Sequence, residues 1–280
     1  MINFNGTLVE NDTHISIKNR GFNYGDAVFE TIKVSHSKIL FLEDHYFRLM
    51  ASIRIMRMEI PMAFTMEFLQ AEILKTLEAN QLLKTSARVK IIVNRGEGGF
   101  YAPNSSLVDY IISSEENPNK FYSISNDSYI VDLFKDFYVA PGLLSTLKTN
   151  NKAINVIASV YAKENDYNNC LLLNTNKSVV EATNGNLFLV KGTKIKTPPI
   201  EDGCLKGIMR KQLIELIKLM PEYTLEEASI SPFELQKADE LFITNVIQGI
   251  QPISKYRKKQ FKTNVAQELL KKINVKVRLG

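Results

Sequence analysis

Lys148 is a residue whose surroundings would suit a chemical role. It follows an apolar stretch that contains Leu143, Leu144 and Leu147, and it precedes a segment with helical periodicity. An amine in an apolar pocket has a lowered pKa and can act as a nucleophile or a proton carrier. A lysine considered alone is far more often a solvated surface residue, because lysine is almost never fully buried without a partner. Lys152 is the alternative candidate for the same role.

Residues for several other kinds of chemistry are absent. The glycine-rich segment 96–99 lacks the third glycine and the following helix of a dinucleotide fingerprint. The sequence has no phosphate-binding loop ending in Gly-Lys-Ser/Thr, no H-E-x-x-H motif and no serine nucleophile elbow. His14, His36 and His45 are scattered, so no metal site is expected. Arg95 could bind a carboxylate, although an arginine in a turn is more often solvated.

The composition is that of an ordinary globular protein. The chain has 280 residues, of which 45% are hydrophobic and 23% charged, enough for one large or two modest domains. The net charge of +5 is modest, and the basic run 255–259 is more typical of a solvated face than of a nucleic-acid site. The longest apolar runs are strand-sized and no secretory signal is visible, so no membrane segment is expected. Cys170 and Cys204 lack the spacing of a disulfide framework, which favours a cytoplasmic location.

Periodic patterns predict strands and helices in both halves of the chain. In the first half, strands are expected over 29–34, 38–42, 87–93 and 108–113, and helices over 43–56 and 65–78. In the second half, strands are expected near 129–134, 137–139, 170–173, 178–181 and 187–190, and helices after Lys148 and over about 205–220. The helix after Lys148 has an apolar stripe of Ile154, Ile157, Val160 and Tyr161. Ser231–Glu234 is a capping box with proline at the first helical position, so a short helix begins there.

The polar, proline-containing segment 114–120 is the best domain boundary. It separates an N-terminal lobe, residues 1–113, from a larger C-terminal lobe, residues 121–280. Because strands alternate with helices in both lobes, the pattern predicts a two-lobed protein of the mixed α/β or α+β class.

Six separated segments together resemble one family. They are Arg20–Thr31, His45–Leu49, Leu147–Asn151, Val180–Phe188, Gly207–Arg210 and Ala238–Asn245. Each is weak alone, but in this order and spacing they are similar to the class IV aminotransferases. These are the fold-type IV pyridoxal 5′-phosphate (PLP) enzymes, which include branched-chain aminotransferases, D-amino acid aminotransferases and 4-amino-4-deoxychorismate lyase. The resemblance covers most of the chain. It implies the fold-type IV architecture, with PLP between the two lobes of a homodimeric enzyme.

The resemblance also implies roles for single residues. Lys148 would hold PLP as a Schiff base, the internal aldimine, and would shuttle the proton at the substrate Cα. Glu181, with Asn186, would keep the pyridine nitrogen protonated, so that the ring can act as an electron sink. Thr31 matches a threonine that the lyases commonly carry.

The remaining implied contacts concern the cofactor phosphate. Arg48, near the start of a helix, resembles the phosphate arginine of the family, although it could instead pair with Asp44 on the helix surface. Gly207 and Ile208 open a helix whose N–H groups can bind a dianion. The family places its last phosphate and rim contacts at the positions of Thr244 and Asn245.

The function that follows is a class IV aminotransferase that moves an amino group between an amino acid and a 2-oxo acid. The alternative is a 4-amino-4-deoxychorismate lyase, which releases pyruvate and 4-aminobenzoate from an aminodeoxychorismate-like substrate. Thr31, the Gly207–Arg210 segment and Asn245 favour the lyase, whereas the apolar Phe100 and Tyr101 do not. A catalytically silent PLP-binding protein is the alternative of another class, and the presence of Lys148 argues against it. The sequence determines neither the substrate nor its stereochemistry.

Overall fold

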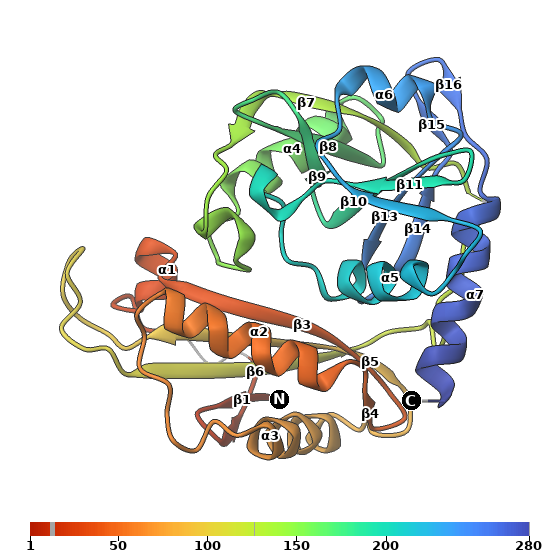
Figure 1. The fold of residues 1–280 in the computed structure, drawn as a ribbon. Helices are drawn as coiled ribbons and strands as arrows, with labels where there is room; N and C mark the ends of the chain where they lie inside the picture. The colour runs from red at the N-terminus through yellow and green to blue at the C-terminus, as the bar shows by residue number, and fades with distance from the viewer. Residues whose placement is uncertain (12–14, 126, 280) are drawn as a thin grey trace. The chain divides into compact units, whose positions relative to one another are not determined.

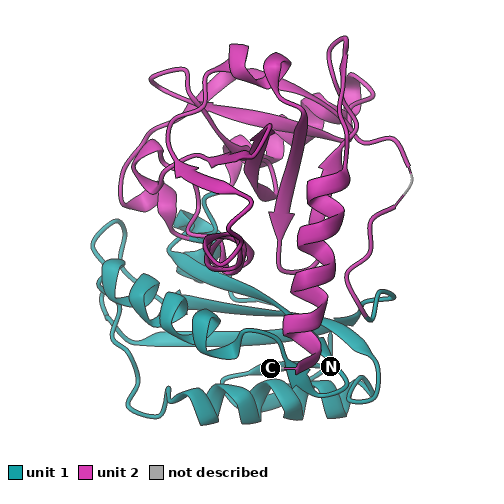
Figure 2. Ribbon diagram, turned by 45° about the vertical axis from the view of Figure 1, so that its right-hand side comes forward, with its two compact units in different colours: residues 1–120, 148–151 teal, residues 121–147, 152–280 magenta. Residues whose placement is uncertain are grey.

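The computed structural model describes residues 1–280 except 12–14, 126 and 280. These residues divide into two compact units, which Figure 2 colours separately. The first unit contains residues 1–120 and 148–151, and the second contains residues 121–147 and 152–280. The segment that carries Lys148 therefore belongs to the first unit, although both of its flanks belong to the second.

The first unit is an antiparallel sheet with two longer helices (Figure 1). The strand order is β2-β1-β6-β5-β3-β4. The strands are β1 (Ile2–Phe4), β2 (Thr7–Val9), β3 (Ala27–Ser35), β4 (Lys38–Ile39), β5 (Ser86–Arg95) and β6 (Val108–Glu116). The helices are α1 (Arg20–Tyr24), α2 (Leu42–Ile55) and α3 (Met66–Ala79).

Alternation along β3 decides which side chains enter the core of the first unit. Val28, Ile32 and Val34 pack with residues of α2 and α3. Glu30 has the same parity and therefore points to the same, helix-covered face. Phe29 and Thr31 point to the opposite face.

The segment Lys148–Asn151 extends the sheet of the first unit along β3. The Phe29 amide donates to the Lys148 carbonyl at 2.8 Å, and the Asn150 amide donates to the Ala27 carbonyl at 3.0 Å. An isolated antiparallel bridge joins Val28 and Thr149. Backbone hydrogen bonds thus fix the position of Lys148 relative to β3.

The second unit is a larger mixed sheet. Its strands follow the order β12-β11-β10-β9-β8-β7-β15-β16, and β13 pairs with β10 and β14. The strands are β7 (Ile130–Val139), β8 (Asn169–Asn174), β9 (Val179–Ala182), β10 (Gly185–Lys191), β11 (Lys194–Thr197), β12 (Thr224–Glu227), β13 (Glu240–Asn245), β14 (Gly249–Ile253), β15 (Lys255–Tyr256) and β16 (Lys259–Gln260). The helices are α4 (Ala153–Glu164), α5 (Ile208–Lys218), α6 (Pro232–Lys237) and α7 (Asn264–Leu279), with 3-10 turns at Leu144–Thr146 and Ile200–Asp202.

Most predicted elements are confirmed within a few residues, including the capping box of Ser231 and Glu234 at the start of α6. The predicted stripe of α4 is confirmed for Ile154 and Tyr161, which pack against the core, and is wrong for Ile157 and Val160. Ala158 and Ala162 are the buried residues of this helix, whereas Ile157 and Val160 are exposed at 43% and 50%. The small alanine side chains let α4 approach the sheet closely, which hydrophobicity alone did not indicate.

None of the helices among the described residues combines the length and the apolar character that a membrane span requires.

Candidate active site

Lys148 lies against the aromatic ring of Phe29 in the first unit. Its Nζ is 4.5 Å from the ring centroid, and Lys90 Nζ is 5.0 Å from the same centroid. Both are cation–π distances. Burial lowers the pKa of Lys90, with a further contribution from the charge of Arg88. The amines of Lys148 and Lys90 thus both contact the ring of Phe29.

Thr31 lies two positions after Phe29 on the same face of β3, and it pairs with Lys90 across β5. The Thr31 side chain is 8% exposed. The first unit thus brings Lys148, Thr31 and Lys90 to one face of the sheet.

Arg48 is held by a carboxylate that the sequence analysis did not select. Its Nε donates to Glu30 Oε1 at 2.7 Å, and its Nη2 donates to Glu30 Oε2 at 2.5 Å. His45, one turn earlier on α2, contributes Nδ1 at 2.7 Å from Glu30 Oε2. A pattern in the sequence could have revealed this cluster: Glu30 is a charged residue at an inward position between the apolar Val28 and Ile32.

Burial alone would raise the pKa of Glu30, but the charge of Arg48 and the hydrogen bonds from His45 and Arg48 lower it to about 2. Burial lowers the pKa of His45, and it outweighs the opposing effect of Glu30. Glu30 is therefore a carboxylate and His45 a neutral ring at neutral pH. Since a carboxylate only accepts hydrogen bonds, the proton of His45 is on Nδ1. Nε2 is then an acceptor, and among the described residues it is buried without a hydrogen-bond partner.

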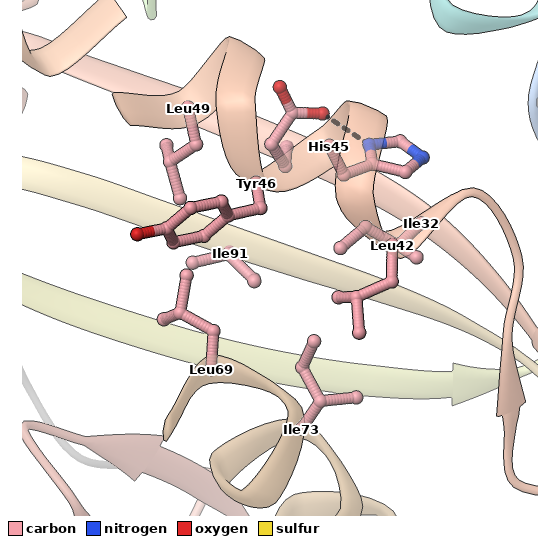
Figure 3. A pocket seen from close by; sticks show the side chains of 9 residues that line it. Ile32, Leu42, His45, Tyr46, Leu49, Leu69, Ile73 and Ile91 are labelled. Carbon is pink, nitrogen blue, oxygen red and sulfur yellow. Dashed lines mark hydrogen bonds and ion pairs between the residues drawn. The ribbon is translucent and has the colours of Figure 1, made fainter. Parts of the chain in front are cut away.

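A small cavity borders this cluster inside the first unit (Figure 3). Apart from Glu30, His45 and Tyr46, its lining is aliphatic: Ile32, Leu42, Leu49, Leu69, Ile73 and Ile91. The cavity is a gap in the core between α2, α3 and the sheet. It offers Glu30 no polar alternative to Arg48 and His45.

Arg95 ends β5 and is not the solvated turn residue that the sequence suggested; the carboxylate that it binds is that of Asp26 in the first unit. It is 7% exposed, and its Nε donates to Asp26 Oδ2 at 2.9 Å. Its two remaining nitrogens donate to the carbonyls of Arg57 and Met56. Arg20 binds the same Asp26 oxygen and donates to the carbonyls of the glycine-rich turn, including that of Phe100. Asp26 thus joins this turn to the body of the first unit.

In the second unit, Glu181, Asn186 and Thr244 form a row across three strands. Asn186 on β10 pairs with Glu181 on β9 and with Thr244 on β13. Glu181 Oε2 accepts from the Leu205 amide at 2.9 Å, and Asn186 Nδ2 donates to the Leu205 carbonyl at 2.8 Å. The two side chains therefore hold the backbone that leads into α5.

Gly207 is the N-cap of α5, and no side chain caps this end of the helix. A Cβ at Gly207 would lie 1.9 Å from Asn186 Oδ1, so only glycine allows this approach. Ile208 begins the helix, and its side chain is buried together with that of Met209. The amides of the first turn can therefore receive an anion.

The other two candidates of the second unit are engaged locally. Thr244 Oγ1 donates to the Gly249 carbonyl at 2.7 Å. Asn245 Nδ2 donates to the Asn184 carbonyl, and its Oδ1 accepts from the amides of Ile247 and Gln248. Both residues thus shape the turn at the end of β13.

The sequence and the fold were compared with known proteins. A model of the family described as amino-transferase class IV matches residues 27–256. A putative branched-chain-amino-acid aminotransferase of Methanocaldococcus jannaschii is 30% identical, over 98% of this chain and 94% of its own length. The chain belongs to the class IV aminotransferase family. An aminodeoxychorismate lyase of Vibrio harveyi is 27% identical over 86% of this chain and 87% of its own. A D-alanine aminotransferase of Bacillus licheniformis is 25% identical over 90% and 86%.

Solved structures show the same fold for this class IV aminotransferase. The branched-chain aminotransferase of Thermoproteus uzoniensis, solved with norvaline, has a TM-score of 0.86 at 23% identity and covers 97% of this chain and 92% of its own. The branched-chain aminotransferase of Thermobaculum terrenum, solved in its PLP form, has a TM-score of 0.84 at 22% identity and covers 99% and 93%. The expected fold class, mixed α/β of fold type IV, and the expected family are thereby confirmed.

His14 lies outside the described residues, and among the residues that are described no group of three or more His, Cys, Asp and Glu side chains could hold a metal ion. Lys152, the alternative to Lys148, is the N-cap of α4 and belongs to the second unit.

Proposed function

We propose that this class IV aminotransferase uses PLP to move an amino group between an amino acid and a 2-oxo acid, with Lys148 as its catalytic lysine. One observation carries the proposal: the backbone of β3 holds Lys148, with its Nζ against Phe29. The strand that holds Lys148 also carries Thr31 and Glu30, and Glu30 binds Arg48. The proposal thus rests on side chains that lie in one compact unit.

The residues of both units fit a phosphorylated pyridine cofactor. The first turn of α5 has no side-chain cap. It begins at Gly207, where any Cβ would clash with Asn186 Oδ1. Arg48 supplies a cation, and Glu30 holds its guanidinium through two hydrogen bonds. We therefore assign Arg48, Gly207 and Ile208 to the phosphate, and Asn186, Thr244 and Asn245 to the backbone that surrounds it.

Glu181 is the proposed partner of the pyridine nitrogen. Its Oε2 accepts from the Leu205 amide, which fixes the carboxylate at the end of β9. A carboxylate beside that nitrogen favours its protonated form.

PLP supplies an aldehyde that condenses with amines and a ring that withdraws electrons from the substrate Cα. Lys148 is the residue that would hold the aldehyde of PLP through its Nζ, and the same Nζ would carry the proton of the substrate Cα. Lys148 would have to be uncharged to accept this proton.

The substrate carboxylate is assigned to Lys90 and Thr31, which pair across β3 and β5. Lys90 and Lys148 contact the same ring of Phe29, and this shared contact supports placing the substrate carboxylate at Lys90. Replacement of Lys90 by methionine should raise KM for the amino donor by at least about tenfold, the usual effect of losing a charge-assisted hydrogen bond.

The second candidate function is 4-amino-4-deoxychorismate lyase, and the 27% identity to the Vibrio harveyi enzyme supports it. A panel of D- and L-amino acids with 2-oxoglutarate, alongside aminodeoxychorismate, separates the two functions. Formation of glutamate supports transamination, whereas release of pyruvate and 4-aminobenzoate supports the lyase. A coloured protein that turns over neither substrate would indicate a silent PLP-binding protein.

We also propose that the enzyme is a homodimer of the cytoplasm. Phe22, Phe100 and Tyr101 of the first unit are exposed at 70%, 85% and 91%, and exposed aromatic side chains are typical of interfaces. Cys170 and Cys204 are free thiols, which suits a reducing compartment. Light scattering of the protein and of Tyr101→Ser tests the dimer, which the substitution should weaken.

A further inference from the structure

We propose that Glu30 and His45 are positioning residues, which set the affinity for the cofactor phosphate by fixing the guanidinium of Arg48. The inference rests on the proposed function, because it assumes that Arg48 binds the phosphate of PLP.

The geometry of the ion pair restricts Arg48 strongly. Its Nε and Nη2 bond to different oxygens of Glu30, at 2.7 and 2.5 Å. Two parallel hydrogen bonds define the plane of a guanidinium as well as its position. A single contact would leave the planar group able to rotate about the bonds of its side chain.

His45 fixes the carboxylate in turn. Its Nδ1 is 2.7 Å from Glu30 Oε2, and both side chains are almost fully buried. The other residues that line the cavity beside Glu30 are aliphatic except for His45 and Tyr46, so none of these lining residues is a second cation for Glu30. Arg48, Glu30 and His45 thus form one chain of contacts, from a half-buried cation to two buried groups.

Glu30 has two opposing effects on an anion at Arg48. Its negative charge weakens the attraction between Arg48 and a phosphate, so that its loss would strengthen binding if charge alone mattered. Its hydrogen bonds hold Arg48 in place, so that its loss would weaken binding if position mattered more. The positioning effect of Glu30 outweighs the effect of its charge. The sign of the change in the PLP dissociation constant on loss of Glu30 distinguishes the two cases.

The experiment uses the full-length protein freed of cofactor and titrates it with PLP and, separately, with pyridoxal, which lacks the phosphate. Glu30→Gln is expected to raise the dissociation constant of PLP by about tenfold to a hundredfold, as a lost charge-assisted contact does, and to leave that of pyridoxal within about twofold. Glu72→Gln, in α3 of the same unit, removes a carboxylate remote from Arg48 and should change neither constant.

Two further comparisons separate positioning from a general structural defect. If Glu30 acts through Arg48, adding Glu30→Gln to Arg48→Ala should cause no further loss of PLP affinity. His45→Asn places an amide N–H near the position of Nδ1 and should keep PLP affinity within about threefold of the parent, whereas His45→Leu should lower it by at least about tenfold. This pair of histidine variants provides the test if Glu30→Gln does not fold.

An unchanged or tighter PLP constant in Glu30→Gln, with a weaker one in Arg48→Ala, would overturn the inference and leave the proposed phosphate site intact. Additive effects in the double variant would overturn it as well. If Arg48→Ala itself binds PLP as tightly as the parent, the phosphate assignment of Arg48 fails, and the inference fails with it.

Discussion

The amide of Phe29 donates a hydrogen bond to the carbonyl of Lys148, and the Nζ of the same lysine lies 4.5 Å from the Phe29 ring centroid. Phe29 therefore contacts both the backbone and the side chain of Lys148. Phe29 belongs to the first family segment, although the sequence analysis assigned it no role of its own.

Lys148→Ala is expected to abolish the visible absorption band of the PLP-treated enzyme and its bleaching by borohydride, because the amine that bonds the aldehyde is gone. The fold should persist, since the bonds to β3 involve only the backbone of Lys148. Absorbance spectra and circular dichroism provide the measurement. Lys152→Ala is the control and should retain the band. Loss of the band in the control and its retention in Lys148→Ala would show that the wrong lysine was chosen.

Glu181→Gln tests the electron-withdrawing role of the ring. Glutamine keeps an oxygen that can accept from the Leu205 amide, but it removes the charge that favours a protonated pyridine nitrogen. The single-turnover conversion of bound PLP to its pyridoxamine form should fall by about two to three powers of ten, or about 3–4 kcal/mol of barrier. Stopped-flow absorbance follows this step. Conversion at the parental rate would show that Glu181 does not contact the ring nitrogen.

The stability of the protein in acid should depend on Glu30. Its pKa is lowered from 4.5 to about 2, so its contribution is complete above about pH 4.5 and is lost as the pH falls toward 2. The contribution is on the order of 3 kcal/mol. Urea unfolding of the parent and of Glu30→Gln from pH 7 to pH 3 gives the measurement. The difference in unfolding free energy should be constant near neutrality and shrink below pH 4.5. A difference that grows in acid would contradict the assignment.

Glu240 should stabilise the second unit through α7. This buried carboxylate accepts from the amides of Val265 and Ala266 in the first turn of the helix. Glu240→Ala leaves these donors without an acceptor and should lower the free energy of unfolding by about 1–3 kcal/mol. Glu240→Gln should cost less, because one acceptor oxygen remains. Thermal and urea unfolding measure both, and Glu164→Ala, at the exposed end of α4, should change stability by less than about 0.5 kcal/mol. Equal losses in all three variants would rule out a specific cap.

Strong period-two and helical patterns predicted the elements that carry the core. The hairpin of β3 and β4, helices α2 and α3, and strands β8 to β10 all follow such patterns. Helix α7 was not predicted, although its sequence is amphipathic; the carboxylate that accepts from the amides of its first turn, Glu240, is remote in sequence. It also missed the short strands β15 and β16, where the basic run 255–259 contains the fully buried Tyr256.

Local motifs identified candidate residues but not the partners that tertiary structure provides. Arg48 was selected from a motif near the start of a helix. Glu30 and His45 contact each other, and Glu30 contacts Arg48, only because β3 packs against α2. Arg95 shows the opposite case. From the sequence, its guanidinium appeared free to bind a ligand or solvent. In the structure it bonds to the Asp26 carboxylate and to two carbonyls that are distant in sequence.

The assignment of residues 148–151 to the first unit has a consequence for recombination between related genes. Residues 148–151 belong to the first unit, while residues 121–147 and 152–280 on either side of them belong to the second. Genetic recombination within residues 114–120 would therefore join the β3 of one parent to the Lys148 segment of another. Such chimeras receive Phe29 and Lys148 from different parents. Because the hydrogen bonds between β3 and residues 148–150 use only backbone atoms, they can form whichever parent supplies each segment, and only the contact of Lys148 Nζ with the Phe29 ring depends on the residue that the other parent contributes.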